Sequence, residues 1–146
     1  MLPLMRPKKK ILLVDDDAAV LDLVVEWLKS RGHEAIATSY AAEAVALAQD
    51  HNVDLIILDL IMPEVGGADA AAALSQDPAT KDIPVIFLTG LVGKGEEPLG
   101  IAAGKGHRMI AKSCDREEFL TAVDEVLAQN QARKGEGHGQ KNTDDR

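Results

Sequence analysis

The chain of 146 residues contains a single cysteine, Cys114, so no disulfide can form within it. Proteins without disulfides are typical of reducing compartments, and we expect this one in the cytoplasm. No apolar run approaches the roughly 18 residues that a membrane span requires. The N-terminal stretch MLPLMRPKKK has too little apolar length before its charges for a signal peptide. These absences predict a cytoplasmic protein with no membrane segment.

Basic residues are also in short supply, since 16 Lys and Arg face 24 Asp and Glu, for a formal net charge of -8. Such a chain repels nucleic-acid phosphates and anionic membrane surfaces, so direct DNA binding is not expected. The hydrophobic content of 46% is typical of a soluble protein with one core. We therefore expect one domain over residues 8–130, preceded by an extension (1–7) and followed by a polar, disordered tail (131–146).

Short apolar runs typical of strands alternate with stretches of helical periodicity. The third run, VDLIILDL, has the unbroken apolar middle of a central parallel strand that is buried on both faces. Serial βα units of this kind predict an α/β fold, a doubly wound five-stranded parallel sheet of flavodoxin-like order 2-1-3-4-5 with helices on both faces. The expected strands cover residues 10–14, 33–39, 53–60, 83–90 and 108–112, and the last two have the apolar sequence of buried strands. The expected helices cover 18–32, 40–50, 68–76 and 115–130.

Capping residues mark the ends of several expected helices. Gly32 is placed to end the first helix, and Ser39 is a possible N-cap of the second. Asp115 and Glu118 have the spacing of a capping box at the start of the last helix. Where a fourth helix belongs, residues 89–108 carry six glycines and a proline, which predicts a short or irregular segment.

Polar residues stand where the expected strands end. Asp15 and Asp16 follow the first strand, Asp59 ends the third, Thr89 ends the fourth and Lys112 ends the fifth. Ligands of open parallel sheets bind at this edge, so these side chains should converge. Clustered carboxylates suit Mg²⁺, a lysine can neutralise a phosphoryl group, and an aspartate can attack phosphorus.

The motifs ILLVDDD, DLIILDLIMPEVGG, PVIFLTG and AKS, in this order and spacing, resemble the receiver domain of bacterial two-component response regulators. The resemblance extends over about residues 8–130. It implies a phosphoacceptor signalling protein that receives phosphate on Asp59 from a sensor histidine kinase or a phosphotransfer protein. Such a protein acts through contacts with a downstream protein and is not an enzyme beyond its own phosphorylation and dephosphorylation. No output domain follows, so we expect a stand-alone receiver.

The resemblance also implies a role for each residue of the site. The implied Mg²⁺ ligands are the carboxylates of Asp15, Asp16 and Asp59 and the backbone carbonyl of Ile61. The hydroxyl of Thr89 and the ammonium group of Lys112 would contact the phosphoryl group. By the same resemblance, Thr89 and Met109 form a switch region.

Two positions depart from the pattern of this family. Ser113 stands where a proline usually follows the lysine, and Met109 stands where an aromatic side chain usually turns inward. A flexible methionine can fill an inward or an outward pocket. An aromatic switch at this position is therefore excluded.

Three other functions remain to be compared with this one. A phosphohydrolase with an aspartyl nucleophile would need an acid two residues after it, where Ile61 stands. A flavin-binding protein of this fold would need a phosphate loop after the first strand, where DDDAAV would repel phosphate. A binding module that has lost phosphorylation stays open because of Ser113 and Met109. No ligand spacing links the four histidines, which we expect at the surface: His33, His51, His107 and His138.

Overall fold

The structure, a computed structural model, describes residues 8–59, 67–89, 108–112 and 114–129. Several predictions fall outside these residues. They concern the extension 1–7, the backbone carbonyl of Ile61, the glycine-rich segment after Thr89, the residue Ser113 and the tail 131–146.

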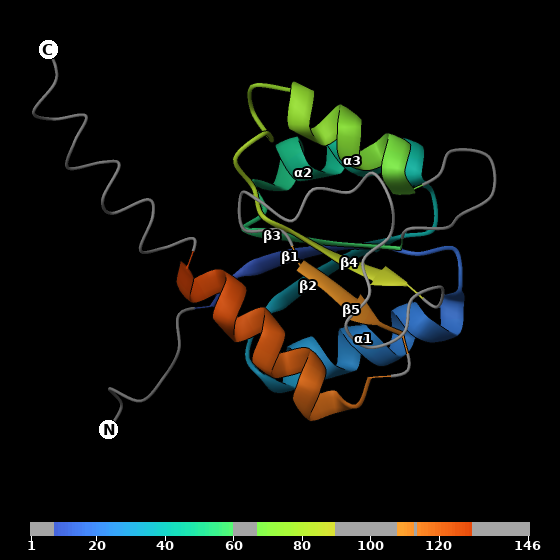
Figure 1. Ribbon diagram of the computed structural model, residues 1–146, viewed down its shortest axis with the longest axis vertical. Coiled ribbons are helices and arrows are strands. Elements are labelled where there is room, and N and C mark those ends of the chain that lie inside the picture. The colour runs from blue at the N-terminus through green and yellow to red at the C-terminus, as the bar shows by residue number, and fades with distance from the viewer. Residues whose placement is uncertain (1–7, 60–66, 90–107, 113, 130–146) are drawn as a thin grey trace, which may run out of the picture.

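The described strands form one parallel sheet of five strands in the order β2-β1-β3-β4-β5, which confirms the predicted topology (Figure 1). The strands are β1 (Lys10–Val14), β2 (Glu34–Thr38), β3 (Leu55–Asp59), β4 (Val85–Thr89) and β5 (Arg108–Ala111). At the carboxyl end of β1, Val14 is the register partner of Thr38 on one side and of Leu58 on the other. The first and third strands therefore end side by side.

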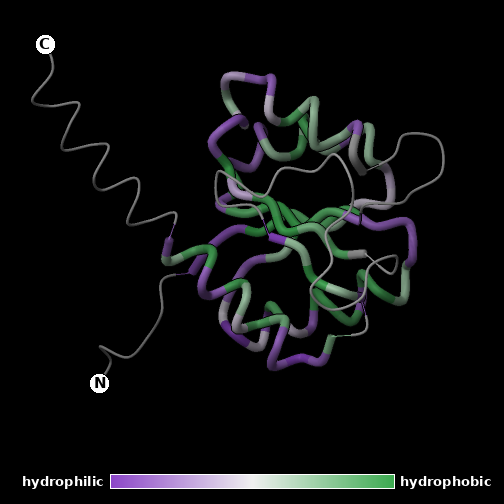
Figure 2. The backbone as a smooth tube through the Cα atoms, viewed as in Figure 1, coloured by the Kyte–Doolittle hydropathy of each residue, from purple (hydrophilic) through white to green (hydrophobic). Residues whose placement is uncertain are grey.

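Helices cover both faces of the sheet, as predicted (Figure 1). On one face, α1 (Ala18–Ser30) and the C-terminal helix (residues 116–129) pack on alternate strand residues such as Ile11 and Leu13. On the other face, α2 (Ala44–His51) and α3 (Gly67–Gln76) pack on Leu12 and Val14. The strands between the two layers are hydrophobic along most of their length (Figure 2). This double cover explains the unbroken apolar runs of the central strands.

Capping residues define the ends of α1 and the start of the C-terminal helix. Asp17 is the N-cap of α1, and Gly32 follows that helix with a φ of +88°, a left-handed conformation that glycine adopts without strain. The capping box before the C-terminal helix is confirmed. The backbone N–H of Glu118 donates to Asp115 Oδ1 at 2.9 Å, and that of Asp115 donates to Glu118 Oε1 at 3.1 Å.

The prediction of Ser39 as an N-cap is wrong. The chain first forms one 3₁₀ turn, η2 (Ala41–Glu43), whose N-cap residue Tyr40 makes no side-chain capping bond. The hydroxyl of Thr38, one residue before Ser39, accepts the backbone N–H of Tyr40 instead. A hydroxyl two residues before an amide closes a tight turn, so the serine is not needed there.

Two predictions of exposure also need correction. His33 is 5% exposed rather than at the surface, because its Nδ1 accepts the backbone N–H of Lys9 at 3.3 Å beside β1. β5 is half-buried along its whole length, although its apolar sequence suggested a buried strand. It lies at the edge of the sheet, where only one neighbouring strand covers it.

Among the described helices, none combines the length and the apolar composition needed to cross a lipid bilayer.

Candidate functional site

Three carboxylates gather at the carboxyl edge of the sheet. Asp15 directly follows β1, Asp59 is the last residue of β3, and Asp16 stands at the start of the connection to α1. One carboxylate oxygen from each lies within 4.8 Å of the others. Asp15 and Asp59 are each 3% exposed, whereas Asp16 is exposed. The neighbouring ends of β1 and β3 thus build the predicted acidic cluster.

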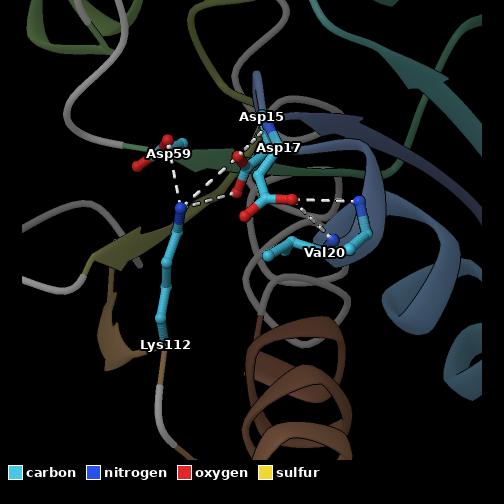
Figure 3. A network of polar contacts seen from close by, with 6 residues as sticks. Asp15, Asp17, Val20, Asp59 and Lys112 are labelled. Carbon is cyan, nitrogen blue, oxygen red and sulfur yellow. Dashed lines mark hydrogen bonds and ion pairs between the residues drawn. The ribbon is translucent and has the colours of Figure 1, made fainter.

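Asp15 is held from both its backbone and its side chain. Its backbone N–H donates to the carbonyl of Thr38 at 3.2 Å, and its Oδ1 accepts the backbone N–H of Asp17 at 2.9 Å. Asp17 in turn accepts the backbone N–H groups of Ala19 and Val20, which ties the cluster to the first turn of α1 (Figure 3). The Asp-Asp-Asp run is therefore split between two tasks, since Asp17 caps a helix while Asp15 faces the site.

Lys112, which follows β5, points toward Asp15 and Asp59 (Figure 3). Its Nζ lies 3.1 Å from Asp15 Oδ2 and 3.3 Å from Asp59 Oδ2. Partial burial lowers the pKa of the Lys112 ammonium, but its hydrogen bonds and charge interactions with Asp15 and Asp59 outweigh burial and raise the pKa above its ordinary value. Lys112 therefore stays positively charged at neutral pH.

One carboxylate oxygen of the cluster lacks a hydrogen bond from the described residues. Asp15 Oδ2 is buried and accepts no well-oriented hydrogen bond from the described residues, although it forms the ion pair with Lys112. Among the described residues, this cluster of three carboxylates is paired with one cation, the ammonium group of Lys112, which contacts Asp15 and Asp59. A hard divalent cation with oxygen ligands, such as Mg²⁺, fits both the leftover negative charge and this buried oxygen.

The other predicted residues are placed only in part. Thr89 ends β4 beside β5, with Ala111 as its register partner, but its side chain lies outside the described part of the structure. Met109 is half-buried on β5 and packs against the core that α2 and α3 cover. Ile61 and Ser113 lie outside the described residues. The structure therefore brings Asp15, Asp16, Asp59 and Lys112 together.

Cys114 stands two residues after Lys112 and just before the C-terminal helix. Burial raises the pKa of its thiol, and the negative charges of Glu118 and Asp115 raise it further. A thiol of this kind stays protonated at neutral pH and is a poor nucleophile.

Sequence reasoning gave no role to Thr38, whose backbone carbonyl accepts the amide of Asp15. A hydroxyl residue at the end of a strand, five positions before Glu43 at the start of a helical segment, was the signal that could have found it.

Comparison with known proteins gives consistent matches. The sequence profile described as the response regulator receiver domain matches residues 11–124. The polar-differentiation response regulator DivK of Brucella ovis is 31% identical over 119 residues, which cover 82% of this chain and 96% of that protein.

Solved structures agree with this match. The chemotaxis protein CheY4 of Vibrio cholerae has a TM-score of 0.73 and 28% identity, covering 82% of this chain and 99% of that one. The receiver domain of sensor histidine kinase PA1611 from Pseudomonas aeruginosa has a TM-score of 0.73 and 22% identity, covering 84% and 99%. In that protein a magnesium ion is coordinated in the active site cleft, and its likeness to this chain is one of fold.

Proposed function

We propose that this chain, which belongs to the family of response regulator receiver domains, is a phosphoacceptor of a two-component or phosphorelay system that is phosphorylated on Asp59. The phosphate would come from a histidine kinase or a phosphotransfer protein, with Mg²⁺ bound by the acidic cluster. The phosphorylated protein would act in the cytoplasm through contacts with a downstream protein. It would not turn over a separate substrate.

The observation that supports this proposal best is the position of Lys112. Its ammonium group lies against the carboxylates of both Asp15 and Asp59 at the edge where parallel sheets bind ligands. A buried carboxylate beside a fixed cation can stay ionised and remain nucleophilic. The same cation lies close enough to neutralise charge on a phosphoryl group that arrives at Asp59.

The chemistry follows from these positions. A carboxylate oxygen of Asp59 attacks phosphorus, a new O–P bond forms, and the P–N bond of a phosphohistidine breaks. The electron pair of that bond goes to the departing imidazole. Asp15 and Asp16 would hold Mg²⁺ beside Asp59, and the bound cation supplies charge neutralisation for the phosphoryl oxygens. Lys112 keeps its proton throughout and pairs with the negative charge that builds up.

The test is the intact mass of the full chain after incubation with Mg²⁺ and a small phosphodonor. Acetyl phosphate offers an acyl phosphate, and phosphoramidate offers the P–N bond of a phosphohistidine. We expect the mass of one phosphoryl group on the parent, none on Asp59→Asn, and none when a chelator removes the metal. Asp59→Asn keeps the shape of the side chain and removes only its charge and nucleophilicity.

Two outcomes would contradict the proposal. Equal phosphorylation of the parent and of Asp59→Asn would place the acceptor elsewhere. A folded parent that gains no phosphoryl group from either donor would instead favour a binding module that works without phosphorylation.

A further inference from the structure

Thr38, the last residue of β2, uses its hydroxyl twice although it is only 7% exposed. The hydroxyl donates to Glu43 Oε1 at 2.5 Å and accepts the backbone N–H of Tyr40 at 3.1 Å. The first bond reaches the end of η2, and the second closes the turn before it. Together they tie both sides of the β2–η2 turn to one side chain.

Packing alone does not fix the part of this turn between Thr38 and Tyr40. Tyr40 is 65% exposed, so its ring buries little surface against the core. Ala41, at the start of η2, is buried against the core under α2 and α3, so packing fixes the turn only where η2 begins. The two bonds of the Thr38 hydroxyl therefore fix the conformation at the end of β2.

The same residue is connected to the acidic cluster through its backbone. The carbonyl of Thr38 accepts the amide of Asp15, one residue beyond the end of β1. The Asp15 side chain then presents its buried Oδ2 to the cluster. A rotation of the Thr38 peptide would thus shift the backbone from which this ligand projects.

We propose that Thr38 is a positioning residue for the metal site, with Glu43 as its anchor. The hydroxyl bonds of Thr38 hold the β2–η2 turn, the turn holds the Thr38 carbonyl, and the carbonyl holds Asp15 in the geometry that a divalent cation requires. This inference rests on the proposed function, because it assigns Thr38 a role in the Mg²⁺ site of that function. Replacing a group that orients a metal ligand commonly weakens the binding of the metal.

The chain offers a matched control. Thr80, in the connection between α3 and β4, is 1% exposed, and its hydroxyl donates to the carbonyl of Leu74 at 2.6 Å. Thr38→Val and Thr80→Val each remove a buried, bonded hydroxyl and keep the side-chain shape. Of the two residues, Thr38 is the one whose backbone is hydrogen-bonded to the acidic cluster, through the amide of Asp15. Their difference separates positioning of the metal ligand from loss of stability.

The experiment measures the affinity of the full chain for Mn²⁺, which substitutes for Mg²⁺, from the electron paramagnetic resonance signal of the free ion. We expect Thr38→Val to weaken binding by roughly fivefold. Thr80→Val should bind like the parent. Thr38→Ser, which restores the hydroxyl, should recover most of the affinity. Phosphorylation of Thr38→Val by acetyl phosphate should be slow at low Mg²⁺ and should approach the parent rate at saturating Mg²⁺.

A second pair of variants tests the anchor without disturbing a buried residue. Glu43→Gln keeps the acceptor oxygen and removes the charge, so it should bind Mn²⁺ like the parent. Glu43→Ala removes the acceptor and should weaken binding in the same direction as Thr38→Val. This pair keeps the inference testable even if Thr38→Val fails to fold.

The outcomes are distinct. Equal Mn²⁺ affinity for the parent, Thr38→Val and Glu43→Ala would overturn the role of Thr38. Failure of Thr38→Ser to recover affinity would also overturn it, since shape rather than the hydroxyl would then matter. A folded parent that binds no Mn²⁺ would instead overturn the metal site of the proposed function, and this inference with it.

Discussion

The two edges of the sheet differ in how their polar groups are hydrogen-bonded and balanced in charge. At the amino edge Asp54 and Lys10 bond to each other in both directions, since the backbone N–H of Lys10 donates to Asp54 Oδ2 at 2.9 Å and that of Asp54 donates to the Lys10 carbonyl at 2.7 Å. At the carboxyl edge three carboxylates face one ammonium group, and Asp15 Oδ2 is buried without a well-oriented hydrogen bond from the described residues.

The difference matches the proposed function, in which the carboxyl edge holds a cation and the bonds at the amino edge support the fold. The two hydrogen bonds between Asp54 and Lys10 contribute modestly to folding. Unbalanced carboxylates at the carboxyl edge repel one another and cost stability, and a bound cation would offset that cost. Changes at the two edges should therefore separate folding from metal binding and phosphorylation.

The largest effect is expected when Lys112 is replaced. Lys112→Ala leaves Asp15 and Asp59 without their cation, which should slow phosphorylation on the order of a hundredfold. In the presence of chelator the variant should lose about 1–2 kcal/mol of unfolding free energy, less than a fully buried pair would lose because Lys112 is partly exposed. Added Mg²⁺ should restore much of that stability. Urea unfolding and phosphorylation kinetics measure both effects.

Arg108→Ala is the matched control for this variant. It removes another cation, at the start of β5, that forms an exposed ion pair with Glu125 at 2.6 Å. An exposed pair contributes little, so stability should change by less than about 1 kcal/mol and phosphorylation should be unchanged. If both variants behaved alike, Lys112 would have no special role at the carboxyl edge.

The pH dependence of stability gives an independent check on Lys112. A lysine whose pKa is raised by folding stabilises the fold below its ordinary pKa of 10.5, and that contribution is lost as the pH rises through the raised value. The stability difference between the parent and Lys112→Ala, measured without metal, should therefore be constant at neutral pH and shrink in strong alkali. A difference that shrank already between pH 7 and 9 would contradict the ion pair.

A smaller and opposite effect on the fold is expected at Asp16. Asp16→Asn removes one of three crowded charges, so the metal-free protein should become slightly more stable while Mn²⁺ affinity falls by at least about tenfold. Thermal unfolding with chelator and a metal titration would show the two changes. A variant that lost stability but kept its metal affinity would place Asp16 outside the site.

At the amino edge, Asp54→Ala should lower the stability of the fold and leave metal affinity unchanged. It removes the bond to the Lys10 amide and should cost about 1 kcal/mol of unfolding free energy. Metal affinity and phosphorylation should match the parent, because Asp54 stands at the opposite end of β1 from Asp15. If metal affinity fell together with stability, the two edges of the sheet would not contribute independently to folding and metal binding.

The smallest expected effect concerns Cys114. Because its pKa is raised, alkylation by iodoacetamide should be slow at neutral pH and should accelerate only in alkali above the ordinary thiol pKa of 9.0. Intact mass against time at several pH values measures the rate. A free small-molecule thiol serves as the reference, and a Cys114 rate above that reference at pH 7 would contradict the raised pKa.

The sequence predicted the fold well because its signals were local and repeated. The first strand has the predicted bounds, the topology follows from serial βα units, and the capping box at Asp115 forms as its spacing indicates. Convergence of Asp15, Asp16, Asp59 and Lys112 followed from one rule about strand ends in parallel sheets.

The remaining features depend on contacts between segments that are far apart in sequence or on competition among close neighbours. His33 is buried because its ring meets the amide of Lys9, a contact that no periodicity reveals. Ser39 and Thr38 are equally suited by type to the turn before η2, and only the strand register decides between them. β5 has an apolar sequence but lies at a sheet edge, and edge position is a property of the whole topology.

The chain contains one tryptophan and one tyrosine, and the fold sets them at two informative places. The rings of Trp27 in α1 and Phe119 in the C-terminal helix are 5.4 Å apart between centroids, whereas Tyr40 lies exposed on the turn held by Thr38. Indole fluorescence therefore reports the docking of the last helix. The NMR signals of the Tyr40 ring report the turn beside the acidic cluster. The protein therefore carries two intrinsic spectroscopic probes, and both processes can be followed in one unlabelled sample.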